Sequence, residues 1–79
     1  MLTSNNECYI MAYFTGERSA VLFVNNESYG AEDFRIRFPY EVKKVKSLSK
    51  PHWYKLKSDG NFFEIHVNNR DFDIVEIEW

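Results

Sequence analysis

Apolar and polar residues alternate along most of this chain, and the two-residue period is the feature that most constrains its fold. In residues 34–38, three apolar side chains fall on one side and two arginines fall on the other. Successive side chains of a β-strand point to opposite faces, so this period indicates half-buried strands. No stretch has the spacing of an amphipathic helix. The sequence therefore predicts an all-β protein.

We expect these strands to be short and to be joined by turns rich in Gly, Pro, Asn, Asp and Ser. The strongest turn signal is Asp59-Gly60, because both residues tolerate the positive φ of a tight hairpin. Strand spacings of roughly 8–12 residues are typical of a small antiparallel β-sandwich or meander barrel. The sequence predicts a single domain over residues 1–79 with about seven strands, at residues 8–14, 19–25, 34–38, 42–48, 54–57, 62–67 and in a last segment that ends at Trp79.

The first two expected strands, residues 8–14 and 19–25, are apolar on both of their faces. Strands of this kind are typical of central positions in a sheet, so we expect them there, paired as a hairpin. A second copy of the chain covering one face is the alternative, which leaves a homodimer open. We expect the first strand to carry Cys8, Ile10, Ala12 and Phe14 on one face and Tyr9, Met11 and Tyr13 on the other.

The core must come from packing alone, because Cys8 is the only cysteine and no intrachain disulfide is possible. Seven Phe, five Tyr and two Trp supply the apolar area that a 79-residue chain needs. The two histidines, His52 and His66, have no cysteine or histidine partners at the spacing of a structural zinc site. We therefore expect no metal and no cofactor.

Basic residues concentrate in residues 34–57, which hold eight Lys and Arg against Glu41, although the whole chain has a net charge of −2. Glutamates occupy the corresponding outward positions of the later strands, so we expect cross-strand pairing to leave this segment as an ordinary solvated face. The alternative is a basic face that is open to a ligand, formed by Arg35, Arg37, Lys55 and Lys57.

Aromatic residues outside the expected core are the better candidates for a binding site, because exposed rings are where sugars, bases and protein partners dock. The alternative is that these rings close the ends of a sandwich. Phe62 or Trp53 beside the basic side chains would also form a stacking platform for single-stranded nucleic acid. The aromatic candidates are Tyr29, Tyr40, Trp53 and Phe62.

No catalytic residue is expected. The chain has no glycine-rich phosphate loop, no Ser-His-Asp arrangement and no nucleotide fingerprint. Glu76 and Glu78 are two residues apart on one strand, and Asp71 and Asp73 are interpreted as turn residues, so neither pair predicts an acid–base site. Without a signal peptide or a long apolar run, we expect a cytoplasmic location and no membrane partner.

The segments FRIRFPYEVKKVKSL, YKLKSDGNFFEIHV and DFDIVEIEW resemble, in their order and turns, the small C-terminal β domain that follows the catalytic barrel in several glycoside hydrolase families. The resemblance covers residues 34–79 and implies a non-catalytic accessory module that packs against a barrel and contacts sugar. Two alternatives remain open. One is a stand-alone inhibitor or regulatory protein of the phage or mobile-element type, which occludes a larger protein, and the other is a single-stranded nucleic-acid binder. A protein is the partner we expect, with carbohydrate and nucleic acid as the alternatives.

Overall fold

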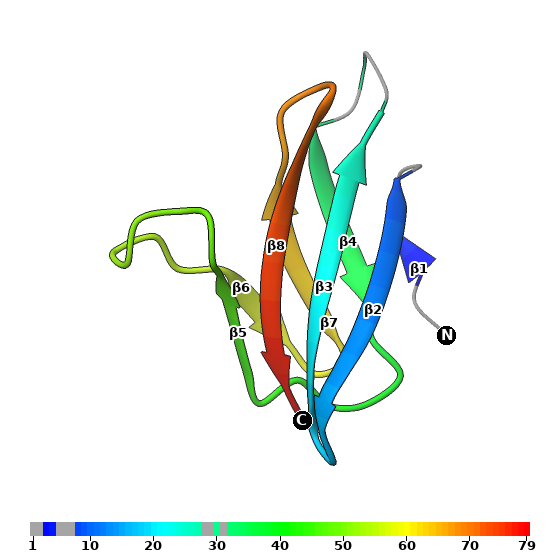
Figure 1. Cartoon of the computed structure of the whole chain (residues 1–79), viewed down its shortest axis with the longest axis vertical. Helices are drawn as coiled ribbons and strands as arrows, with labels where there is room; N and C mark the ends of the chain where they lie inside the picture. The colour runs from blue at the N-terminus through cyan, green and yellow to red at the C-terminus, as the bar shows by residue number, and fades with distance from the viewer. Residues whose placement is uncertain (1–2, 5–7, 28–29, 31) are drawn as a thin grey trace.

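The fold is a β-sandwich of two four-stranded antiparallel sheets, seen in a computed structural model that describes residues 3–4, 8–27, 30 and 32–79 (Figure 1). Sheet A has the strand order β1-β4-β7-β6, and sheet B has the order β2-β3-β8-β5. No helix occurs in these residues, and the sheets do not close into a barrel, so the all-β sandwich prediction is confirmed. The strands are β1 (Thr3–Ser4), β2 (Tyr9–Gly16), β3 (Ser19–Asn26), β4 (Asp33–Arg37), β5 (Lys44–Ser47), β6 (Lys57–Asp59), β7 (Phe62–His66) and β8 (Asp71–Glu78).

The core lies between the two sheets and is built by the alternation seen in the sequence. In β3, β4 and β7 every second residue is buried, and Leu22, Ile36 and Phe63 have no exposed surface at all. Each of these side chains adds about 1.5–3 kcal/mol on burial, which is the main source of stability in a chain without a disulfide. The buried apolar residues are Ala20, Leu22, Val24, Phe34, Ile36, Phe38, Val42, Phe63, Ile65, Val67, Val75 and Ile77.

Two hairpins, β2–β3 and β6–β7, are the places where consecutive strands pair. The second turns at Gly60, whose φ of 59° requires the left-handed region that glycine adopts without strain. This confirms the hairpin predicted at Asp59-Gly60. The links from β3 to β4, β4 to β5, β5 to β6 and β7 to β8 each cross from one sheet to the other. The chain is therefore a sandwich rather than a meander.

The position of β2 corrects one prediction. Both strands of the first hairpin were expected to be central, but only β3 is, between β2 and β8, while β2 is an edge strand of sheet B. Its inward-facing side chains are not all covered, because Ala12 is exposed and Phe14 is 72% exposed. The strand at the corresponding edge of sheet A is β1, which has two residues and pairs only with the end of β4.

The position of Asp73 corrects another prediction. It was interpreted as a turn residue, but it lies within β8, faces the core and has no exposed surface. Its carboxylate accepts hydrogen bonds from the Ser47 hydroxyl at 2.9 Å, from the Ser49 hydroxyl, and from the Ile74 amide at 2.7 Å. The Lys50 ammonium lies 3.8 Å away. The carboxylate thus ties the start of the β5–β6 connection to β8, which is how a buried charge is tolerated.

Candidate interaction surfaces

The outer face of sheet B is largely apolar, and we call it the apolar face. The register sets Met11 of β2 opposite Phe23 of β3, and Phe23 opposite Ile74 of β8. The Tyr13 ring meets the Phe23 ring edge to face, with 5.6 Å between centroids. Leu48 continues the face beyond β5, where its amide donates to the Ile74 carbonyl at 2.8 Å. The apolar face comprises Tyr9, Met11, Tyr13, Val21, Phe23, Leu48, Phe72 and Ile74.

This face is open rather than covered by the rest of the chain. The exposed fractions of Tyr9, Tyr13 and Phe72 are 68%, 56% and 53%, and Met11 is 49% exposed. At roughly 200 Å² per aromatic side chain, the three rings alone leave about 350 Å² in contact with water. The largest apolar patch on a typical monomer covers about 300–600 Å² and often has a function. The apolar face therefore has the size of a binding surface before its smaller residues are added.

Charged side chains border the apolar face on one side. Lys44 and Lys46 of β5 stand opposite Glu78 and Glu76 of β8. This confirms that glutamates interleave with part of the basic segment. These four side chains place equal numbers of both signs at the margin, which leaves no local charge excess there.

The outer face of sheet A carries three of the predicted basic candidates, Arg35, Arg37 and Lys57, and the fourth, Lys55, lies beside it in the β5–β6 connection. Arg35 stands opposite Glu64 of β7, and Glu64 stands opposite Lys57 of β6. Arg35, Lys55, Lys57 and Glu64 line a groove of about 380 Å³. Arg37 lies next to it, in a second depression that it shares with Arg35 and Phe62. The structure thus brings the basic candidates together, but with acidic side chains among them.

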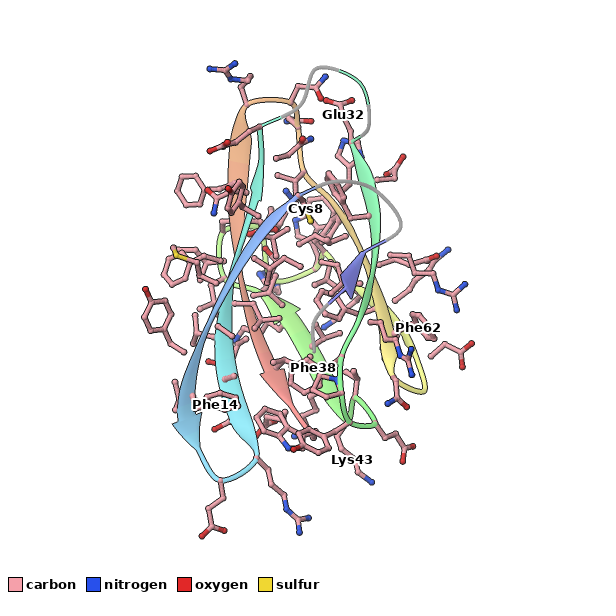
Figure 2. The ribbon with its side chains drawn as sticks, turned by 90° about the vertical axis from the view of Figure 1, so that its right-hand side faces the viewer. Cys8, Phe14, Glu32, Phe38, Lys43 and Phe62 are labelled. Carbon is pink, nitrogen blue, oxygen red and sulfur yellow. The ribbon has the colours of Figure 1, made fainter. Side chains whose placement is uncertain are left out.

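Phe62 is also on this face, where the Arg35 guanidinium lies over its ring at 4.3 Å from the centroid. A cation placed in this way is attracted by the ring quadrupole. Figure 2 shows Phe62 on the sheet A side of the molecule, away from Phe14 on β2. Because the Arg35 guanidinium occupies one side of the ring, Phe62 offers less stacking surface than a free platform would.

At the end of the same groove, His66 contacts two oxygen atoms. Its Nδ1 lies 2.8 Å from an Asp33 carboxylate oxygen, and its Nε2 lies 3.2 Å from the Asn68 side-chain oxygen. The hydrogen bond to Asp33 raises the pKa of His66 above its ordinary value, and the bond to Asn68 acts in the same direction. Both neighbours are acceptor oxygens, so the ring can donate to both of them only when the imidazole is protonated.

The aromatic candidates do not form one cluster. Tyr40 stacks on Trp79 with 5.6 Å between centroids and an interplanar angle of 10°, and Phe38 packs on the same indole at 4.9 Å. Tyr40 therefore helps to close one end of the sandwich. Trp53 lies in the connection between β5 and β6, which projects to one side in Figure 1, and is 70% exposed. Tyr29 lies outside the described residues.

The residues that sequence reasoning missed are those of β2. Tyr9, Met11 and Tyr13 were expected on the second face of a central strand, and they are instead exposed on the apolar face together with Phe72 of β8, which was not a candidate either. The signal was present in the sequence as two successive strands that are apolar on both faces. A chain of 79 residues has too few elements to cover four such faces.

In the part of the chain that the structure describes, no group of three or more His, Cys, Asp or Glu side chains is arranged to hold a metal ion. The same residues include no helix with the length and apolar character that crossing a membrane requires. No protein-family model, no curated protein and no solved structure matches this chain. The resemblance to glycoside hydrolase accessory domains therefore stays a prediction.

Proposed function

We propose that this protein is a non-catalytic interaction module that binds a protein partner through the apolar face. One observation carries the proposal, which is that Tyr9, Tyr13 and Phe72 lie on one sheet face with more than half of each side chain exposed. Aromatic side chains with this exposure are the typical anchors of protein interfaces, because each removes a large apolar area from water with few rotatable bonds.

The chemistry of the face favours a protein over the other partner classes. Nucleic acid requires an excess of Lys and Arg to neutralise phosphates, and the apolar face has no such excess at its margin. The outer face of sheet A does carry basic side chains, but Asp33, Asp59 and Glu64 lie among them on the same strands. Sugar sites combine rings with convergent polar groups, whereas the exposed side chains of the apolar face are almost all apolar.

Two settings use this contact chemistry. In an accessory module, the apolar face packs against a neighbouring catalytic domain, as the sequence resemblance implies. In a stand-alone inhibitor, the face occupies the surface of a separate enzyme. The two settings differ in the partner's connection to this chain and not in the residues that make the contact.

Paired variants with equal changes in charge test the proposal. Met11→Glu/Phe72→Glu changes the apolar face, and Arg37→Ala/Lys55→Ala changes the outer face of sheet A, and each lowers the net charge by two. Circular dichroism first verifies that both variants keep the wild-type spectrum. Captured proteins are then compared after cross-linking in lysate of the source cell.

We expect the wild type and the sheet A variant to capture the same partner and the apolar-face variant to lose it. Capture that survives in the apolar-face variant and disappears in the sheet A variant would move the binding site to sheet A. Capture of short oligonucleotides by the wild type, with an affinity that falls steeply as salt increases, would replace the proposal with nucleic-acid binding.

A further inference from the structure

The two sheets have four edge strands, and three of them carry protection against pairing with another chain. An unprotected edge presents free N–H and C=O groups, and proteins avoid this with short strands, charged side chains or proline. Strand β1 has two residues, and β6 has three, of which Lys57 and Asp59 are charged. Strand β5 has four residues, including Lys44 and Lys46. None of these three edges is therefore suited to pairing with another strand.

The fourth edge strand, β2, has none of these features along most of its length. It has eight residues, and no charged residue and no proline occurs from Tyr9 to Gly16. A register shift between Phe14 and Gly16 is its one irregularity, and it lies beside the turn to β3. Figure 2 shows β2 lying across the front of the molecule. An apolar strand of this length with exposed side chains on both faces is a template for another strand.

We propose that β2 pairs in antiparallel orientation with β2 of a second copy of this chain and joins two copies of sheet B into one eight-stranded sheet. A two-fold axis perpendicular to the sheet keeps each face on the same side in both copies. Centred on Ala12, the pairing sets Met11 opposite the partner's Tyr13, and Ile10 opposite the partner's Phe14. Such apolar pairs stabilise antiparallel strands, and no like charges face each other.

The second copy is the occupant because the strand is complementary to itself, with apolar side chains opposite apolar side chains and no charge along its length. The exposed fractions of Tyr9, Met11, Tyr13 and Phe14 are 68%, 49%, 56% and 72%. At roughly 200 Å² each, these side chains expose about 500 Å² per copy. Two copies therefore offer up to about 1,000 Å², the lower limit for a specific interface, in addition to the backbone hydrogen bonds of the new ladder.

This pairing goes beyond the proposed function and does not depend on it. Strand pairing uses the backbone edge of β2, whereas the proposed partner binds the outward side chains of the apolar face, which come from β2, β3, β8 and Leu48. The dimer places two apolar faces side by side on one continuous sheet, so a partner meets a surface of twice the width.

Oligomeric state tests the pairing directly. We expect light scattering and sedimentation to show a dimer that dissociates on dilution from submillimolar to micromolar concentration. Ala12→Lys places two lysines opposite each other at the centre of the paired strands, and we expect it to be monomeric throughout this range. Phe72→Lys adds the same charge on β8, away from the β2 edge, and we expect it to remain dimeric.

Cross-linking tests the geometry without adding a charge. Facing residues of antiparallel strands have Cα atoms about 4.5–5.5 Å apart, a distance that a disulfide spans. In a Cys8→Ser background, Ala12→Cys is expected to give a covalent dimer on mild oxidation, whereas Lys44→Cys on the opposite edge is expected to stay monomeric.

A wild type that is monomeric at every concentration overturns the pairing and leaves the proposed partner binding untouched. A dimer that is dissociated by Phe72→Lys but not by Ala12→Lys also contradicts strand pairing, because it shows that two copies pack face to face. Failure of Ala12→Cys to cross-link, with the protein folded, also contradicts strand pairing. Loss of partner capture by Phe72→Lys, which is expected to remain dimeric, separates the two proposals.

Discussion

The buried carboxylate of Asp73 offers the sharpest test of how this fold is held together. We consider Asp73→Asn, which keeps the size of the side chain and removes its charge. The Asp73 carboxylate accepts hydrogen bonds from the Ser47 hydroxyl at 2.9 Å and from the Ile74 amide at 2.7 Å, and it lies 3.8 Å from the Lys50 ammonium. An asparagine replaces one acceptor oxygen with an NH₂ group that cannot accept these bonds.

The loss of stability in Asp73→Asn follows from the donor groups that lose their acceptor. A hydrogen bond to a charged group contributes about 1.5–3 kcal/mol, and the asparagine loses about one such bond together with the attraction to Lys50. We expect the free energy of unfolding to fall by about 2–3 kcal/mol. In a domain of this size, that change lowers Tm by about 10–20 °C.

Urea denaturation followed by tryptophan fluorescence and far-ultraviolet circular dichroism measures this change, with an unchanged m value as the sign that the unfolded state is the same. The matched control is Asp71→Asn on the same strand, where the side chain is exposed and accepts a hydrogen bond from the neighbouring Phe72 amide. We expect the control to change the stability by no more than about 0.5 kcal/mol. An Asp73→Asn variant as stable as the wild type would refute the reasoning, because the desolvation cost of the carboxylate would then equal what its bonds contribute.

Two further outcomes are expected from single sites. Because the pKa of His66 is raised in the folded protein, its pair with Asp33 stabilises the fold below the ordinary histidine pKa of 6.5, and this contribution disappears as pH rises through the raised value. Both side chains are well exposed, so the pair contributes less than about 1 kcal/mol. We therefore expect His66→Gln to be less stable than the wild type by up to this amount at pH 5.5 and equally stable at pH 8, and high salt should reduce the difference at pH 5.5. Gly60→Ala forces a side chain onto a φ of 59° in open space, so we expect a loss of about 1 kcal/mol in thermal unfolding, and an unchanged Tm would contradict this origin of the cost.

The strands and the core of this protein could be predicted from its sequence because both depend on local pattern. Alternation located β3, β4 and β7, and in β4 and β7 it assigned the buried side chains to the correct face. The boundaries were less certain where charge or proline interrupts the pattern. The expected strand at residues 54–57 is instead β6 (Lys57–Asp59), and Leu56 only packs against the core from the connection.

What could not be predicted depends on contacts between distant segments. Asp73 resembles a turn residue in its local sequence, and its burial depends on Ser47 and Ser49, which precede it by 26 and 24 residues. The edge position of β2 depends on which strands pair within sheet B, where the last strand, β8, takes the other side of β3. The two-residue strand β1 is not visible as a pattern. A strand that is apolar on both faces indicates that both faces must be covered, but the sequence does not show whether this chain or another chain covers them.

That distinction has an energetic consequence for the function proposed here. The exposed aromatic side chains of the apolar face, Tyr9, Tyr13 and Phe72, stay largely in water in the folded chain, so their hydrophobic free energy contributes little to the stability of the monomer. About 350 Å² of aromatic surface on this face corresponds to roughly 9 kcal/mol at about 25 cal/mol per Å². Association costs about 4–15 kcal/mol in lost freedom, so this face alone supports only a weak complex. A complementary apolar surface on a partner, or a second strand on the edge of β2, shifts that balance toward binding. The side chains that contribute little to folding are therefore the ones we expect a partner to need.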